Sequence, residues 1–138
     1  MIKKIGRDSL PIFLSSVYEI EVASNPNPWT EDQIRLELDL PNSDLYCAFQ
    51  SNKLVGFSIV RTYPPEAELL EIAVCKAFLN MGVGTLLINE TLTSLKRIGI
   101  KTLHLEVRKN NQAAINLYRK FSFKEVGERK EYYKGPVE

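Results

Sequence analysis

Three consecutive strand-like runs in the middle of the chain constrain its fold most. Leu45–Gln50, Leu54–Tyr63 and Glu68–Val74 are rich in β-branched, aromatic and aliphatic residues. Ser51-Asn52-Lys53 separates the first two runs, and Pro64-Pro65 interrupts the chain before the third. Connections this short join antiparallel neighbours, because parallel strands need a much longer crossover. The pattern therefore predicts an antiparallel meander within one sheet.

Helical spacing flanks this meander on both sides. Before it, apolar residues recur at helical spacing from Leu10 to Ala23, and a capping-box pattern at Thr30 predicts the start of a second helix. After it, helices are predicted over 85–97 and 111–121, with a strand over 101–107 between them. These segments indicate that helices pack on the sheet formed by the meander.

A short strand at the start of the chain and one last strand over 123–133 complete the predicted order, β-α-α-β-β-β-α-β-α-β. This order is typical of a mixed α/β sheet with helices packed on it. A length of 138 residues fits one domain, which we expect to span residues 1–138.

Composition and charge argue against nucleic-acid, membrane and metal-binding functions. The net charge of +1 argues against a general nucleic-acid surface, because such surfaces carry a basic excess. No apolar run reaches membrane-spanning length, and Met1–Ile5 is too short for a secretory signal, so we expect a cytoplasmic protein. Cys47 and Cys75 lack metal-ligand spacing, and we expect both to be buried thiols.

A small-residue loop, Met81-Gly82-Val83-Gly84-Thr85, follows an apolar strand and opens a helix. Backbone N–H groups in such a loop can converge on a pyrophosphate, aided by the positive end of the helix. The dinucleotide-binding pattern fails, because Leu87 occupies the third glycine position, and no Gly-Lys-Thr or Gly-Lys-Ser follows. The loop alone leaves two interpretations open, namely phosphate binding and a tight strand-to-helix turn.

Two residues near the end of the chain could move protons. Glu106 is the last outward residue of its strand; it is either a solvated surface acid or, when partly buried, a general base with a raised pKa. Tyr118 lies on the apolar stripe of the following helix, as a core aromatic or as a proton donor to a departing thiolate.

Three other residues are weaker candidates for a functional role. His104 is the only histidine, and no second ligand or serine nucleophile is spaced to join it in a metal site or triad. Nothing near Cys75 in the sequence would lower its pKa for covalent catalysis. Trp29 follows a proline-rich loop, either as a hydrophobic staple before the second helix or as a wall of a substrate groove.

Taken together, these features resemble the GNAT family of acetyl-coenzyme A dependent N-acetyltransferases, and within it the RimI-like ribosomal-protein-alanine acetyltransferases. The likeness covers nearly all of residues 1–135. Its marks are Pro28-Trp29-Thr30-Glu31, Ile72-Ala73-Val74, Leu105-Glu106-Val107-Arg108 with Asn111, Ala113-Ala114-Ile115, Leu117-Tyr118, and Arg129-Lys130 with Tyr132-Tyr133. The resemblance implies a mixed, mostly antiparallel central sheet with helices on both faces.

The resemblance also implies a cofactor and the residues that serve it. Acetyl-CoA would be the co-substrate, and no metal would be needed. Glu106 would accept the proton of the attacking amine through water, and Tyr118 would protonate the CoA thiolate. Trp29 and Tyr132 would contact the acceptor. The cofactor residues would be Ile72, Ala73 and Val74 for the acetyl and pantetheine portions, Asn80, Met81, Gly82, Val83, Gly84 and Thr85 for the pyrophosphate, and Asn111 through its side chain.

The implied acceptor is a protein N-terminus, such as that of a small-subunit ribosomal protein. A small amine, a lysine side chain, or a decayed CoA-binding interaction module are the alternatives. Leu79 replaces the family's usual glutamine or arginine before the glycine loop, so one polar contact to CoA is expected to be missing. Ser122 replaces the usual glycine after the tyrosine helix. A last strand is also expected to be absent, which would leave an open edge and a monomer or a homodimer.

Overall fold

The computed structural model describes residues 1–107, 111–121, 123–127 and 132–136, and side chains as far as Phe123. Within these described ranges, seven strands form one sheet: β1 (Ile2–Ile5), β2 (Ser43–Gln50), β3 (Lys53–Tyr63), β4 (Glu66–Val74), β5 (Thr102–Glu106), β6 (Lys124–Gly127) and β7 (Tyr132–Pro136). Their order in the sheet is β1-β2-β3-β4-β5-β7-β6. The described pairings are antiparallel except for β4 with β5, which confirms a mixed, mostly antiparallel sheet.

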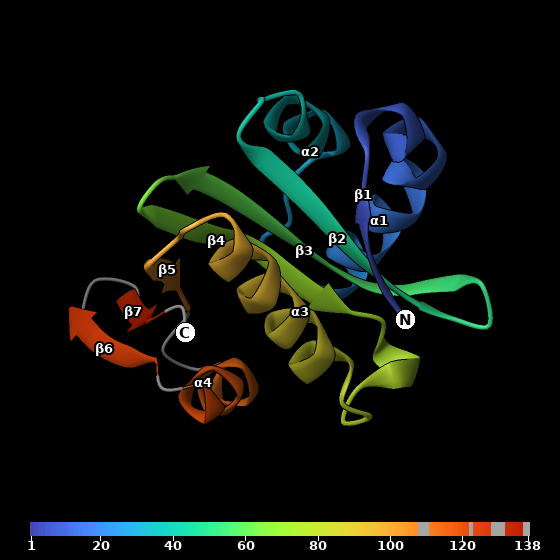
Figure 1. Ribbon diagram of the computed structural model, residues 1–138. Helices are drawn as coiled ribbons and strands as arrows, with labels where there is room; N and C mark the ends of the chain where they lie inside the picture. The colour runs from blue at the N-terminus through green and yellow to red at the C-terminus, as the bar shows by residue number, and fades with distance from the viewer. Residues whose placement is uncertain (108–110, 122, 128–131, 137–138) are drawn as a thin grey trace.

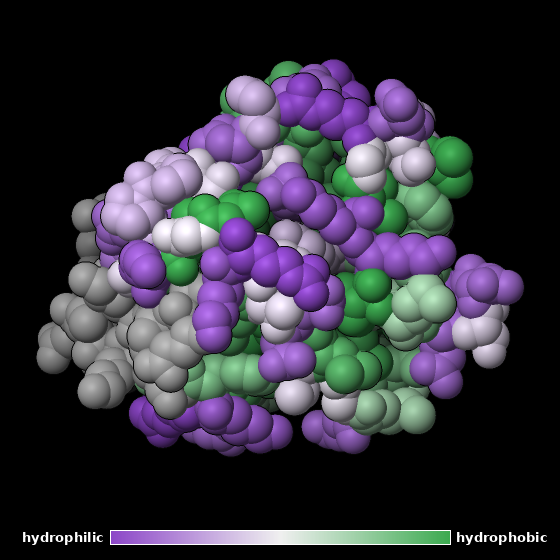
Figure 2. Space-filling model, viewed as in Figure 1, coloured by the Kyte–Doolittle hydropathy of each residue, from purple (hydrophilic) through white to green (hydrophobic). Residues whose placement is uncertain are grey.

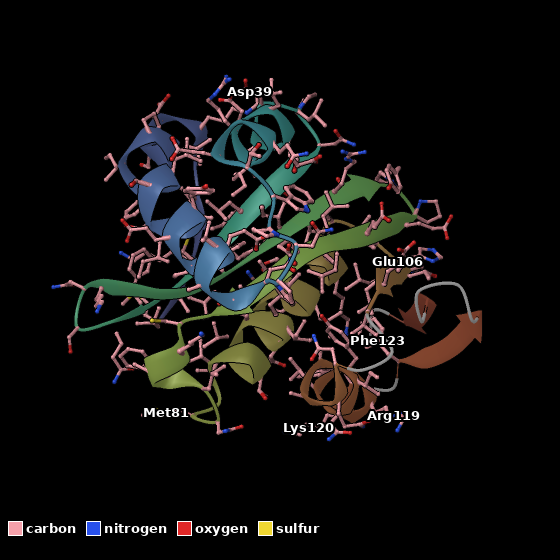
Figure 3. All side chains as sticks on the ribbon, turned by 180° about the vertical axis from the view of Figure 1, so that it is seen from behind. Asp39, Met81, Glu106, Arg119, Lys120 and Phe123 are labelled. Atoms are coloured by element: carbon pink, nitrogen blue, oxygen red, sulfur yellow. The ribbon has the colours of Figure 1, made fainter. Side chains whose placement is uncertain are left out.

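Helices cover both faces of this sheet, as expected. They are α1 (Leu10–Ser24), α2 (Glu31–Leu38), α3 (Val83–Arg97) and α4 (Gln112–Lys120), with short 3-10 turns η1 (Arg7–Ser9) and η2 (Lys76–Phe78). Helix α3 crosses the near face in Figure 1, and α1 crosses the opposite face in Figure 3. Each face has its own apolar core, one beneath α3 and α4 and one beneath α1 and α2. Every helix in the described part of the chain is too short or too polar to cross a membrane.

Local signals in the sequence place several of these elements correctly. The Thr30 hydroxyl accepts a hydrogen bond from the Gln33 N–H at 3.1 Å, and the Gln33 side-chain oxygen accepts one from the Thr30 N–H at 2.7 Å. This reciprocal capping box confirms the predicted start of α2. Gly99 adopts a φ of 84° just after α3, as its helix-ending role requires.

The predicted last strand over 123–133 is wrong. The chain instead forms β6, which ends at Gly127, and β7, which begins at Tyr132. Strand β7 begins with the Tyr132-Tyr133 segment itself and pairs with both β5 and β6, so it occupies an interior position in the sheet. The expected absence of a further strand beyond that segment stays a prediction. A continuous β-rich stretch had hidden the break at Gly127. Cys75 is also less buried than expected, since it is partly exposed, whereas Cys47 is buried.

Strands β4 and β5 diverge along their length. They pair in parallel register from Glu66 with Thr102 to Leu69 with Leu105, and β5 ends one residue later. Strand β4 continues to Val74, and in the described residues it pairs beyond Leu69 with β3 alone. Part of its backbone is therefore open to a ligand on the β5 side.

A β-bulge in β4 lies at this point of divergence. Ile59 of β3 opposes Glu71, while the next residue, Val60, opposes Leu69, so Leu70 is the extra residue. A bulge changes the alternation of side chains between the two faces of a strand. Leu69 packs into the core beneath α3, as its spacing predicts, but the alternation is reset before Glu71.

Candidate active site

A cavity of about 650 Å³ lies between the end of β4, the start of α3 and helix α4. Backbone-rich segments form much of its wall, because the glycine loop and the open end of β4 meet there. The lining residues are Ser24, Ile72, Ala73, Val74, Lys76, Phe78, Leu79, Asn80, Gly82, Val83, Gly84, Thr85, Ala113, Ala114, Asn116, Leu117, Tyr118 and Lys120. We refer to it as the cofactor cavity.

The glycine loop owes its shape to left-handed backbone conformations. Asn80 and Gly82 have φ values of 62° and 83°, a region that costs little only for glycine and asparagine. Gly82 is the N-cap of α3, so the free N–H groups of the first helical turn face this end of the cavity. This arrangement suits a phosphate-bearing ligand, because the helix N-terminus attracts anions.

Gly84 has a different role. A Cβ built on it would lie 3.2 Å from Cδ2 of Leu117, which is closer than nearly all real contacts of this kind. The absence of a side chain at Gly84 therefore lets α3 and α4 approach each other across the cavity. The Gly-x-Gly spacing combines one glycine for backbone conformation with one for close packing.

Eight of the ten cofactor residues expected from the sequence line this cavity: Ile72, Ala73, Val74, Asn80, Gly82, Val83, Gly84 and Thr85. Met81 does not line it, because its side chain is 62% exposed at the tip of the loop (Figure 3). Two cations that the sequence analysis missed, Lys76 and Lys120, also line it and could pair with phosphate oxygens. Exposed apolar residues gather at the surface over η2 and the first turn of α3 (Figure 2).

A second cavity, of about 550 Å³, lies where β4 and β5 diverge. Its walls come from the end of α1, the bulged part of β4, the end of β5 and the start of α4. The lining residues are Ser24, Asn25, Pro26, Leu69, Leu70, Glu71, Ile72, Ala73, Glu106, Val107, Asn111, Ala114 and Tyr118. We refer to it as the acceptor cavity, since a second reactant can reach the first from here.

The two cavities meet at a shared wall. Ser24, Ile72, Ala73, Ala114 and Tyr118 line both of them. A group held at the inner end of one cavity therefore lies next to a group held at the inner end of the other. Such a junction brings two reactants together without a covalent intermediate on the protein.

Tyr118 stands at this junction. Its side chain is only 4% exposed and packs beside Phe123, with ring centroids 5.8 Å apart. Burial raises the pKa of Tyr118 well above its ordinary value, and the negative charge of Glu71 acts in the same direction. The phenol thus stays neutral and keeps its proton available. The core-aromatic interpretation of Tyr118 is confirmed, and its role as a proton donor stays a prediction, for a residue that lines both cavities.

The remaining predicted residues lie around the acceptor cavity. Glu106 lines it and is exposed, which fits the surface-acid alternative for this carboxylate and not the partly buried one. Asn111, expected on the cofactor, lines the acceptor cavity instead, and its Oδ1 accepts the Ala114 N–H at 3.2 Å as the cap of α4. The backbone of Tyr132 pairs with Glu106, whereas its side chain lies outside the described residues.

Trp29 and His104 are engaged elsewhere. Trp29 is partly buried against the core beneath α1 and α2, as the staple interpretation requires, and it lines neither cavity. The His104 imidazole lies against the Glu66 carboxylate on the neighbouring strand. Among the described residues, no group of three or more histidines, cysteines or acids is arranged to hold a metal ion.

Two acids that the sequence analysis missed meet beside the acceptor cavity. The Asn25 Nδ2 donates to Oε2 of Glu71 at 3.0 Å and to Oε2 of Glu21 at 3.2 Å. Burial raises the pKa of Glu71 to about 8, and the hydrogen bond and negative charge of Glu21 add to the rise, while Asn25 opposes it. No sequence spacing links residues 21 and 71; only the fold brings α1 and β4 together.

Comparison with known proteins accounts for this architecture. Residues 14–123 match the model of the acetyltransferase (GNAT) family. The chain belongs to the GNAT family of acetyltransferases. As a GNAT enzyme it uses acetyl-CoA as co-substrate, and the glycine loop, the helix N-terminus and the two lysines of the cofactor cavity fit a phosphate-bearing group.

Two relatives and one solved structure that match most of this chain carry the same named activity. Ribosomal protein bS18-alanine N-acetyltransferase of Haemophilus influenzae is 36% identical over 120 residues, which cover 87% of this chain and 81% of the relative. The Escherichia coli K12 enzyme of the same name is 33% identical over 123 residues, covering 87% and 80%. The crystal structure of the Escherichia coli ribosomal-protein-S18-alanine N-acetyltransferase superposes with a TM-score of 0.86 at 26% identity, covering 99% and 93%.

Proposed function

We propose that this GNAT enzyme acetylates the N-terminal α-amine of a protein, and that the protein is a ribosomal protein. The observation that carries the proposal is the junction at Tyr118, where an acetyl-CoA cavity meets a second cavity lined by carboxylates. Relatives named as alanine N-acetyltransferases of ribosomal protein bS18 support the choice of acceptor. Such a protein would be modified in the cytoplasm.

The chemistry requires three proton movements, two from the nitrogen and one to the thiolate. An α-amine has a pKa near 8 and needs only modest help to lose a proton at neutral pH. The free amine then attacks the thioester carbon directly, and a backbone N–H near Val74, on the open part of β4, polarises the carbonyl oxygen. The C–S bond breaks and the thiolate takes a proton from Tyr118. The second N–H proton, which the nitrogen loses as the amide forms, returns the Tyr118 phenolate to a phenol. Glu106, at the exposed side of the acceptor cavity, receives the amine's proton through water.

A small amine or a lysine side chain is the competing acceptor. Those acceptors would need the same junction, so the geometry alone favours neither class. The similarity to α-amine acetyltransferases decides our order of preference.

Acetyl-CoA binding by isothermal titration, followed by thiol release with an alanine-starting peptide, tests this function. We expect binding and thiol release, with the acetyl group found by mass spectrometry on the peptide's α-amine. The matched control is the same peptide with its N-terminus blocked and a lysine left free. Release with small amines or with the lysine alone would move the enzyme to the competing class.

A further inference from the structure

Glu21 is the most deeply buried acid in the described part of the chain that contacts the site. Its side chain is 0% exposed in the core beneath α1 and α2. Its Oε2 accepts the Asn25 side-chain amide at 3.2 Å and the Trp29 backbone N–H at 3.0 Å. These bonds fix the carboxylate between the end of α1 and the loop that leads to α2.

The other oxygen of Glu21 lacks a donor. No hydrogen bond from the described residues reaches Oε1 of Glu21, although the atom is fully buried. Buried carboxylate oxygens normally accept hydrogen bonds from the protein, because burial removes the water molecules that would otherwise hydrate them. Glu71 lies within hydrogen-bonding reach of Glu21, and both acids share the Asn25 amide. A proton on Glu71 is therefore the donor that this oxygen needs.

We propose that Glu21 and Glu71 form one proton-accepting unit, in which Glu71 takes a proton from the acceptor's ammonium group and Glu21 holds that proton through Oε1. The proposal rests on the acetyltransferase function given above. An N–H bond of the ammonium breaks, and an O–H bond forms on Glu71. The neutral amine that remains carries the lone pair for attack. Glu71 lines the acceptor cavity and touches the substrate, whereas Glu21 is a positioning residue.

Charged groups around the pair are consistent with this assignment. Glu106 of β5 and Tyr118 of α4 line the same cavity as Glu71, and β3 opposes Glu71 with the apolar Ile59. No cationic side chain lines this cavity among the described residues. Two acids this close do not both ionise readily, so the pair exchanges a single proton near neutral pH: its ionised form accepts the amine's proton, and its protonated form is the product of that step. After the amine's proton enters the pair, Glu106 at the exposed side passes it on to solvent.

Infrared spectroscopy of the protein without substrates tests the shared proton directly. A protonated carboxylic acid has a carbonyl stretch that a carboxylate lacks. We expect a carbonyl band that disappears with a midpoint at about pH 8, the pKa of Glu71. The band should be lost in Glu71→Gln and kept in Glu19→Gln, a matched change at an exposed acid on the same helix as Glu21.

Glu21→Gln separates a positioning role from a merely structural one. The side-chain amide that this substitution introduces keeps an oxygen that can accept the Trp29 N–H, and its NH₂ group can donate to the Glu71 carboxylate. Because that bond favours charged Glu71, the midpoint of the band should fall by at least about one pH unit. An unchanged midpoint in a folded Glu21→Gln protein would overturn the role of Glu21. If that variant does not fold, Glu71→Gln still decides whether the band belongs to Glu71.

Kinetics complete the test. Glu71→Gln should lower kcat/KM for the peptide by about 10²- to 10⁴-fold, the usual share of a general base, without changing acetyl-CoA affinity. A near wild-type rate, or a wild-type protein without a band titrating near pH 8, would overturn the proposal. Failure of the wild-type enzyme to acetylate any peptide would instead overturn the proposed function, because the infrared titration uses the protein alone.

Discussion

The two halves of the active site are built in different ways. The cofactor cavity draws most of its wall from the chain between Ile72 and Thr85, and its chemistry lies in backbone groups. The acceptor cavity collects side chains from α1, β4, β5 and α4, and its chemistry lies in carboxylates and a phenol. A ligand shared by a whole family can be held by one short segment of chain, whereas the acceptor depends on long-range packing.

The Tyr118→Phe substitution should have the largest effect, because Tyr118 belongs to both halves. Loss of the phenol proton should lower kcat by about 10²- to 10⁴-fold. Acetyl-CoA affinity, measured by titration calorimetry, should stay within about twofold of the wild-type value. Phe fills the same space, so a large fall in thermal stability would contradict this account and favour a purely structural Tyr118. Tyr18→Phe, at a half-buried tyrosine outside both cavities, is the control.

A smaller loss is expected from Glu106→Gln. Glu106 is exposed, and the proton that it conducts can also pass directly to solvent. We therefore expect kcat to fall by about tenfold to a hundredfold, which is at or below the loss usually caused by removing a general base. Steady-state rates with a saturating peptide measure this effect, and Glu31→Gln, at another exposed acid, is the control. A loss as large as that of Glu71→Gln would make Glu106 the primary proton acceptor.

Gly82→Ala should act on the cofactor half alone. A side chain at a φ of 83° costs about 1 kcal/mol, and relief of that strain would distort the loop. Acetyl-CoA affinity should therefore weaken by about fivefold. Gly99→Ala introduces the same kind of strain at a φ of 84°, far along the chain from the loop. Both variants should lose similar stability, and equal losses of acetyl-CoA affinity would refute the assignment of the loop.

The smallest effect, a gain, is expected from Leu79→Arg. Leu79 is 53% exposed and lines the cofactor cavity. A guanidinium there could pair with a phosphate oxygen, which should strengthen acetyl-CoA binding by about threefold to fivefold at low salt. Ile98→Arg, at an exposed residue at the other end of α3, should leave the affinity unchanged. An equal gain in both variants would point to net charge alone.

The difference between the halves also decides how much of the molecule the sequence predicts. Periodicity and turn residues yield the meander, the helices and the capping box at Thr30, because these depend on neighbours in the sequence. The glycine loop and Tyr118 were found in the same way. Gly127 was overlooked as the end of a strand, so β6 and β7 were merged.

The pair of acids was missed for a physical reason. Glu71 occupies a position where strict alternation along β4 assigns it to the face of Leu69, beneath α3. The bulge at Leu70 instead directs it to Glu21 of α1 and to Asn25, the residue just after that helix. Neither the bulge nor a contact between residues fifty positions apart can be predicted from the local sequence. Lys76 and Lys120 were missed because isolated lysines are common on surfaces.

The bulge at Leu70 decides which face of the sheet receives Glu71. Leu69 and Glu71 lie two positions apart, yet the extra residue turns them to opposite faces. If the bulge lay beyond Glu71, strict alternation from Leu69 would turn this acid beneath α3, while the glycine loop of the cofactor half would keep its sequence. Acceptor chemistry in this fold can thus change with the position of one bulge, without any change in the residues that bind acetyl-CoA.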